Sequence, residues 1–237
     1  MTYYKLEPLV LQDKIVYNQI VGRTILHCDL NNFYASVEQK LHPEYDGMPL
    51  AVCGDPKARH GIVLAKNQLA KQAGVKTAET IWEAKQKCPE LVLVEPHFDE
   101  YVKYSKQVFE IYTSFTDRVE SFGIDECWLD VTGCERLFGD GKAIADTLRK
   151  TVKEKTGLTI SVGVSFTKTL AKLGSDLKKP DATTVLDEKH YMQIIGNMPP
   201  SEMIMVGKHT SEKLEKLNIR TIKDLANADR NALRYQF

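Results

Sequence analysis

The stretch SFGIDECWLDVTG, residues 121–133, places two carboxylates side by side in an otherwise apolar run. Asp125 and Glu126 repel each other, and removing both from water is costly unless an opposite charge neutralises them. A divalent cation is the usual candidate, because Asp and Glu oxygens are ligands that Mg²⁺ prefers. On this stretch alone a solvent-facing turn is the stronger interpretation, since Asp, Glu and Gly gather in hairpin turns.

A third carboxylate, Asp29, follows a short apolar strand over residues 24–28. Successive side chains of a strand point to opposite faces, so Asp125 and Glu126 can share a metal only where the pleat breaks. Gly123 supplies that break and predicts a hairpin turn over residues 122–124. If this hairpin lies beside the first strand, three carboxylates converge. Such a cluster can hold two Mg²⁺ ions about 3.5 to 4 Å apart for phosphoryl transfer.

The order of elements predicts an α+β fold. After the first strand come a helix, an inserted lobe whose strands lie in MPLAVCGD and HGIVLAKN, and a long amphipathic helix from Phe98. The hairpin follows, then a helix over residues 141–156 that ends at Gly157, and a strand over residues 158–165. This order fits a ferredoxin-like sheet with helices on one face and the other face left open.

The side chains of the hairpin's second strand alternate. Cys127, Leu129 and Val131 are expected to face the core. Glu126, Trp128 and Asp130 are expected on the opposite, charged face.

The last fifty residues predict an all-helical lobe. Asp187 is a plausible N-cap, and MVGKHTSEKLEKLNIRTIKDLA resembles a helix-hairpin-helix unit with Gly207 at its hairpin. Its packing side is expected to contain Leu214, Leu217 and Ile219.

Composition indicates a globular chain of 237 residues with 43% hydrophobic residues. No apolar run approaches the roughly 18 residues of a membrane span, and Glu7 and Asp13 interrupt the segment where a signal peptide would be apolar. A cytoplasmic protein without membrane contact is therefore expected. Five scattered cysteines without a C-x-x-C pair predict reduced, mostly buried thiols.

The formal net charge is zero, so any surface for nucleic acid must be local. The clearest candidate is a lysine cluster in SFTKTLAKLGSDLKKPD, which contains Lys168, Lys172, Lys178 and Lys179. By itself such a cluster is more often a solvated helix face than a binding surface.

Three segments, HCDLNNFYASVEQ, GIDECWLD and SVGVSFTKTLAKLGSDLKKPDATTVL, resemble the conserved blocks of Y-family translesion DNA polymerases of the bacterial polymerase IV and mutagenesis-protein type. They occur in the family's order, and the resemblance extends from about residue 24 to residue 237. It implies a ferredoxin-like palm formed by residues 1–32 and 98–186. Residues 33–97 would form small inserted fingers, and residues 187–237 an all-helical thumb that contains the helix-hairpin-helix unit.

The resemblance also implies the roles of single residues. Asp29, Asp125 and Glu126 would be catalytic and bind two Mg²⁺ ions, together with the main-chain carbonyl of Leu30. Tyr34 falls at the steric-gate position, where an aromatic ring excludes ribonucleotides; a simple core aromatic is the alternative. The remaining nucleotide contacts would come from Asn32, Phe33, Gln68, Lys71 and Lys179, and the DNA contacts from Lys168, Lys172, Gly207 and Lys208.

The sequence departs from the family pattern at several positions. Gln68 and Lys71 stand where the family usually has a tyrosine and an arginine, and lysine lacks the bidentate fork of arginine. Gly123 replaces a common serine and Asn31 a frequent acidic residue, but no expected metal ligand is lost. The chain stops within the thumb, so it resembles a catalytic core without the family's little finger, and residues 1–23 exceed the usual leader.

The activity implied is template-directed DNA synthesis across damaged DNA without proofreading, in which the primer 3′-hydroxyl attacks the α-phosphate of a dNTP. The implied partners are primer-template DNA, the dNTP and a sliding clamp bound through a region beyond residue 237. Two alternatives stay open. A palm-fold nucleotide cyclase would share the carboxylates but needs no thumb, and a non-catalytic DNA- or clamp-binding scaffold would not need intact metal ligands.

Overall fold

The computed structural model describes residues 22–54 and 61–237. A five-stranded central sheet has the order β5-β6-β1-β7-β8. β1 is antiparallel to both β6 and β7, whereas the edge strand β8 runs parallel to β7. The strands are β1 (Ile25–Leu30), β5 (Val119–Ser121), β6 (Glu126–Asp130), β7 (Ile160–Ser165) and β8 (Thr183–Leu186).

The first four of these strands, with the helices between them, have the ferredoxin-like connection, so the predicted α+β class is confirmed. Strand β8 is an addition that the sequence pattern did not predict. The first 21 residues of the predicted palm, with Glu7 and Asp13, lie outside the described residues.

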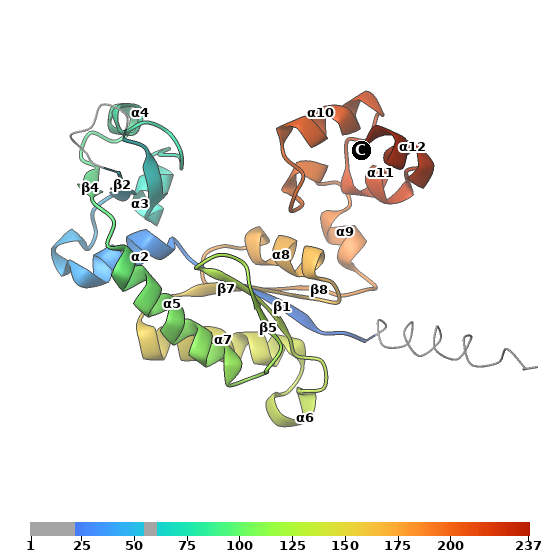
Figure 1. The fold of residues 1–237 in the computed structure, drawn as a ribbon, viewed down its shortest axis with the longest axis horizontal. Coiled ribbons are helices and arrows are strands. Elements are labelled where there is room, and N and C mark those ends of the chain that lie inside the picture. Colours follow the sequence, from blue (N-terminus) through green and yellow to red (C-terminus); the bar gives the residue numbers. More distant parts are fainter. Residues whose placement is uncertain (1–21, 55–60) are drawn as a thin grey trace, which may run out of the picture.

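One face of the sheet packs on α5 (Phe98–Thr113) and α7 (Gly141–Thr156), which lie below it in Figure 1. Alternate residues of each strand point to this face, as the two-residue period of a strand requires. Helix α7 ends as predicted, because Gly157 adopts the left-handed conformation that stops a helix. The main core between these layers includes Leu26, Cys28, Leu129, Val131, Ile160, Val162, Tyr101, Val108, Ile144 and Leu148.

The opposite face is not open, so that prediction was wrong. Helix α8 (Lys168–Leu177) lies across it (Figure 1) and buries Trp128, which is 7% exposed, against Ile25 and Ala171. Helix α8 can cover this face because Gly163 in β7 has no side chain. A Cβ atom on Gly163 would lie 1.9 Å from the carbonyl oxygen of Ala171, so the helix backbone rests directly on the strand.

A smaller sheet forms a lobe of its own, with the order β3-β2-β4. The two strands predicted for this lobe are present. Its elements are η1 (Pro43–Tyr45), β2 (Leu50–Cys53), β3 (Val63–Lys66), α3 (Gln68–Gln72), α4 (Ile81–Lys87) and β4 (Val92–Val94).

Helix α2 (Phe33–Leu41) connects the small-sheet lobe to the central sheet. Phe33 and Val37 pack in the main core, whereas Ala35 packs against Leu50 and Val52 of the lobe. The helix therefore contributes to both cores, and a domain boundary at residue 33 stays a prediction.

The chain ends in a helical lobe, which Figure 1 shows on the same side of the sheet as α8. Leu173 of α8 and Leu186 of β8 share a cluster with Ile195 and Ile222, which anchors this lobe. Its elements are α9 (Tyr191–Ile195), η2 (Pro200–Glu202), α10 (Lys208–Lys216), α11 (Ile222–Asn227) and α12 (Arg230–Gln236). The helix-hairpin-helix unit stays a prediction.

Two details of the helical prediction were wrong. Leu217 is 36% exposed, whereas Leu214 and Ile219 are buried as expected, because Leu217 is the C-cap residue at the end of α10. Asp187 accepts hydrogen bonds from the backbone N–H groups of Lys189 and His190 and so caps a turn, since α9 begins only at Tyr191.

The cysteine prediction is confirmed. All five thiols are free, and only Cys134, just before the short helix α6 (Glu135–Phe138), is partly exposed. In the described part of the chain, no helix is both long enough and apolar enough to cross a membrane.

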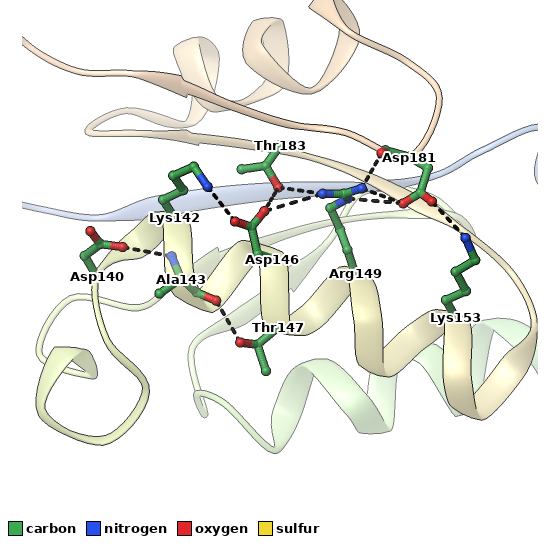
Figure 2. A network of polar contacts seen from close by, with 9 residues as sticks. All are labelled: Asp140, Lys142, Ala143, Asp146, Thr147, Arg149, Lys153, Asp181 and Thr183. Carbon is green, nitrogen blue, oxygen red and sulfur yellow. Dashed lines mark hydrogen bonds and ion pairs between the residues drawn. The ribbon is translucent and has the colours of Figure 1, made fainter.

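A polar network fixes the loop between α8 and β8 (Figure 2). The Arg149 guanidinium on α7 donates to Asp181 Oδ1 at 2.8 Å and also to the carbonyl of Asp181, and Lys153 Nζ lies 3.3 Å from Oδ2. Burial alone would raise the pKa of Asp181, but the bonds from Arg149 and Lys153 hold it below its ordinary value. Asp181 lies two residues after Lys179, so α7 positions the segment that carries this lysine.

The contact between Gly163 and α8 gives the first prediction. Gly163→Ala should lower the free energy of unfolding by about 2–3 kcal/mol or more, because the added methyl group must push α8 off β7. The matched control is Gly54→Ala after β2, where an added Cβ would meet no atom within 4 Å and the backbone has no positive φ. This control should change stability by less than about 1 kcal/mol. Urea denaturation of both variants measures the difference, and equal effects would show that α8 does not rest on Gly163.

Candidate active site

Asp29 and Glu126 are directly opposite each other in the antiparallel β1–β6 pair. Opposite residues of a pair point to the same face, here the face that α8 covers. Asp29 is 5% exposed, and single ligand atoms of His27, Asp29 and Glu126 all lie within 4.8 Å of one another. The sheet register therefore holds two carboxylates together on a largely buried surface.

Asp125 comes from the turn between β5 and β6, not from a strand. Gly123 in this turn has a φ of 86°, a conformation that favours glycine. The carbonyl of Asp125 accepts a hydrogen bond of 3.0 Å from the Leu30 backbone N–H, which ties the turn to the end of β1. The predicted hairpin is confirmed, and the pleat breaks where the adjacent carboxylates require it.

The three carboxylates line one cavity of about 330 Å³. Eight predicted site residues line this cavity, and four further residues come from the small-sheet lobe. The predicted residues in its lining are Asp29, Leu30, Asn32, Phe33, Tyr34, Asp125, Glu126 and Lys179. The residues that the sequence did not predict are Leu64, Ala65, Lys66 and Thr77.

Two lysines neutralise the carboxylates. Lys172 Nζ of α8 lies 3.1 Å from Asp29 Oδ2 and 2.9 Å from Glu126 Oε2. Lys179 Nζ lies 2.6 Å from Asp29 Oδ2 and 2.7 Å from Asp176 Oδ1. Burial would lower the pKa of each lysine, but the carboxylates, Asp29 foremost, raise it above its ordinary value, so both stay charged. These two ammonium groups therefore neutralise part of the negative charge of Asp29 and Glu126.

The two adjacent carboxylates have opposite electrostatic environments. Burial and the charges of Asp29 and Glu126 raise the pKa of Asp125 to about 6. Burial would also raise the pKa of Glu126, but bonds from His27 and Lys172 lower it to about 2. Among the described residues, Asp29 and Glu126 form ion pairs with lysine, whereas Asp125 forms none.

His27 is a buried residue that contacts the Glu126 carboxylate. Its ring is fully buried, with Nε2 3.1 Å from Glu126 Oε2 and Nδ1 2.9 Å from the Ser175 hydroxyl oxygen. Burial is the main reason that the pKa of His27 is lowered. The sequence did not predict this residue, although it lies on the same face of β1 as Asp29, two positions earlier.

Tyr34 forms one wall of the cavity. Its ring stacks on Tyr101 with centroids 4.2 Å apart and planes 9° apart, and meets Phe98 edge-on. Burial and the charge of Asp125 raise the pKa of Tyr34, so its hydroxyl stays neutral. The aromatic stack fixes the ring beside the carboxylates.

The residues before Tyr34 form the start of α2. Asn32 adopts a left-handed conformation with φ 50° and ψ 38°, which turns the chain sharply from β1 into the helix. Asn31 is buried, accepts from the Ser161 hydroxyl at 2.8 Å and donates to the Thr159 hydroxyl at 3.0 Å. Asn31 thus stabilises the strand end in place of the acidic residue expected there.

Lys66 adds a positive charge opposite the carboxylates. It lies at the end of β3 and donates to the Thr77 hydroxyl at 2.9 Å. Burial, and then the charge of Lys71, lower the pKa of Lys66. Lys66 and Thr77 lie far in sequence from the three matched segments. Only the folding of the small-sheet lobe brings these two residues to the cavity.

The other predicted residues lie outside the cavity. Gln68 and Lys71 are on α3 of the small-sheet lobe, and Lys168 Nζ pairs with Glu120 at 2.5 Å and lies over the Trp128 ring. Gly207 and Lys208 are in the helical lobe, where Gly207 directly precedes α10. The structure does not bring these residues to the carboxylates.

The sequence and the fold together show the protein family to which this chain belongs. Residues 28–176, more than half of the chain, match the impB/mucB/samB family, and the chain belongs to this family. It is 56% identical over 205 residues to DNA polymerase IV of Acetivibrio thermocellus, a match that covers 86% of this chain and 51% of that protein. It is 41% identical over 216 residues to DNA polymerase IV 1 of Bacillus subtilis, with 90% and 51% covered. The chain spans about half the length of these relatives.

Solved structures agree with this assignment. A ternary insertion complex of the Dbh DNA polymerase superimposes with a TM-score of 0.81 at 28% identity, covering 90% of this chain and 63% of the other. The crystal structure of DinB from Sulfolobus solfataricus gives a TM-score of 0.79 at 28% identity, with 90% and 62% covered. The Y-family resemblance of the three sequence segments is confirmed.

The opposite environments of the adjacent carboxylates give the second prediction. In chelator at pH 7, Asp125→Asn should raise the free energy of unfolding by about 1–3 kcal/mol, because it removes a carboxylate whose pKa folding raises. Glu126→Gln should lower the free energy by a similar amount, because it removes a carboxylate whose pKa folding lowers.

The pH dependence separates the two effects. The gain from Asp125→Asn is fully present above about pH 6 and disappears as the pH falls toward the ordinary carboxyl value. The loss from Glu126→Gln is fully present above that ordinary value and disappears as the pH falls through about 2. Thermal unfolding in chelator measures both, and changes of the same sign would contradict the electrostatic account.

Proposed function

We propose that the chain is the catalytic core of a Y-family DNA polymerase that extends a primer across damaged template DNA without proofreading. The observation that carries this proposal is the convergence of Asp29, Asp125 and Glu126 in one cavity whose other walls carry Lys179 and Lys66. Negative charge for cations and positive charge for phosphates thus face the same space.

The donor set suits divalent cations. Three carboxylates and a main-chain carbonyl are hard oxygen ligands of the kind that Mg²⁺ takes. Burial and then the negative charges of Asp29 and Glu126 raise the pKa of Asp125, so a nearby cation would stabilise its charged form. Asp29, Asp125, Glu126 and the Leu30 carbonyl would hold two Mg²⁺ ions. When bound, such ions activate the attacking 3′-hydroxyl and stabilise the leaving pyrophosphate.

The chain's own residues would bind and orient the nucleotide. Lys179 and Lys66 offer ammonium groups to the triphosphate, and the backbone of Asn32 and Phe33 offers N–H groups at the start of a nine-residue helix. Lys179 would exchange Asp29 for a phosphate oxygen when cations occupy the carboxylates. Gln68 and Lys71 stay weaker candidates, since α3 lies outside the cavity lining.

Tyr34 would select the sugar. The stacked and edge-on contacts with Tyr101 and Phe98 leave its ring little freedom to yield to a 2′-hydroxyl. A rigid wall discriminates more strongly than a mobile one, because the unwanted group cannot be accommodated by a rotamer change.

The three parts of the structure would have the roles of palm, fingers and thumb that the family resemblance implies. The central sheet would be the palm, the small-sheet lobe the fingers, and the helical lobe a thumb that contacts primer-template DNA near Gly207 and Lys208. Lys168 would contact DNA by exchanging Glu120, an exposed partner, for a phosphate. Clamp binding and a cytoplasmic location are further proposals for the whole protein.

Primer extension gives the third prediction. With Mg²⁺, dNTPs and primer-template in excess, the chain should extend the primer, and Asp29→Asn, Asp125→Asn or Glu126→Gln should slow extension by about 10³-fold or more. Asp99→Asn, an exposed carboxylate in the first turn of α5, is the matched control and should leave extension unchanged. Near-normal extension by Asp125→Asn would contradict the proposed mechanism. DNA binding without any extension would instead support the non-catalytic scaffold.

Sugar selection gives the fourth prediction. Tyr34→Ala should raise ribonucleotide incorporation relative to dNTP incorporation by about a hundredfold or more, because it opens space for the 2′-hydroxyl. Tyr104→Ala removes a partly buried ring that packs on the same core outside the cavity and should leave the ratio unchanged. Single-nucleotide kinetics with paired dNTP and rNTP measure the ratio. If both variants discriminate like the parent chain, Tyr34 is a core aromatic.

A further inference from the structure

A second group of metal-ligating side chains lies apart from the carboxylate cavity. Glu38 and His42 are one helical turn apart at the end of α2, and His97 directly precedes α5. One ligand atom of each lies within 4.8 Å of the other two. None of the three residues lines the cavity with Asp29.

Glu38 is a fully buried carboxylate. Its Oε1 accepts from the Tyr101 hydroxyl and, at 3.2 Å, from the His97 backbone N–H. His97 Nδ1 lies 3.1 Å from Oε1 and 3.0 Å from Oε2. Within residues 22–54 and 61–237, no lysine or arginine forms an ion pair with Glu38. A buried carboxylate is costly without a cation, and a metal ion between Oε2 and His97 Nδ1 would replace the proton that now joins these two atoms.

The two histidines give access from solvent. The side chains of His42 and His97 are 36% and 51% exposed, so an ion can reach Glu38 without unfolding the helices. His42 Nδ1 lies 3.2 Å from Glu44 Oε1. A carboxylate beside one ring nitrogen orients a metal-binding histidine so that its other nitrogen can face the metal.

We propose that Glu38, His42 and His97 bind one Zn²⁺ ion. Two imidazoles and one carboxylate form a ligand set that zinc accepts in tetrahedral geometry, with a fourth position left for water. Zn–N and Zn–O bonds of about 2.0–2.1 Å place tetrahedral ligand atoms about 3.3 Å apart. The Glu38 Oε2 to His97 Nδ1 distance of 3.0 Å is already close to this value.

The position of the group gives the ion a structural effect. The chain leaves the central unit for the small-sheet lobe just after His42, and it returns from the lobe at His97. An ion held by both histidines and by Glu38 ties the outgoing segment to the returning segment. Zinc binding would therefore stiffen the joint between the lobe and the central sheet. This inference does not depend on the proposed polymerase activity.

The test is zinc binding by the 237-residue chain in a buffer that contains excess Mg²⁺, followed by calorimetry and by thermal unfolding. We expect about one equivalent of Zn²⁺ and a Tm rise of about 5–10 °C at a hundredfold excess over Kd. His42→Ala and His97→Ala should each weaken binding by about a hundredfold and abolish the Tm rise.

Two controls make the result specific. His209→Ala and His190→Ala each remove an exposed histidine outside this group, and both should bind zinc like the parent chain. No zinc binding by the parent chain, unchanged binding by His42→Ala, or loss of binding in His209→Ala and His190→Ala would each overturn the proposal. Circular dichroism checks that the variants fold. Should His97→Ala fail to fold, His42→Ala at the helix end decides the outcome alone.

Discussion

The register of β1 against β6 is the constraint on which the site depends. It sets Asp29 directly opposite Glu126, and the hydrogen bond from the Leu30 N–H to the Asp125 carbonyl then brings the third carboxylate alongside. A slip of one residue would turn Asp29 toward the apolar core and break the cluster. The apolar residues on the other face of both strands pack on α5 and α7, so the same core that stabilises the sheet also fixes the position of the charges.

Placing carboxylates on a covered face has an electrostatic cost that α8 and the loop after it offset. Gly163 lets the helix lie close enough for Lys172 to reach Asp29 and Glu126, and Arg149 fixes the loop that brings in Lys179. The ammonium groups of Lys172 and Lys179 therefore offset part of the carboxylate charge. Because the lysines and divalent cations would compete for the same oxygens, cation binding would free lysines to meet phosphates. Stability and function are thus coupled through one set of charges.

Local patterns predicted the site better than its surroundings. Strand alternation and Gly123 predicted the hairpin that carries Asp125 and Glu126, because each signal acts within a few residues. Their convergence with Asp29 also required the ferredoxin-like strand order, which the order of elements suggested. The sequence analysis did not predict that α8 covers the second face. The close contact that Gly163 permits can be recognised only once the position of α8 is known. Lys66 reaches the cavity through the fold of a separate lobe, and no local pattern indicates such a contact. The three family segments supplied the assignment of Tyr34, which its spacing alone would leave as a core aromatic.

The most direct test of this account is the affinity of the metal-free chain for Mn²⁺, measured by electron paramagnetic resonance without nucleotide or DNA. The account predicts that the parent chain binds Mn²⁺, that Asp29→Asn loses this binding, and that Lys179→Met binds Mn²⁺ about tenfold more tightly or better, because the competing ammonium group is gone. Equal affinities of the parent chain and Lys179→Met, or Mn²⁺ binding that survives Asp29→Asn, would contradict it.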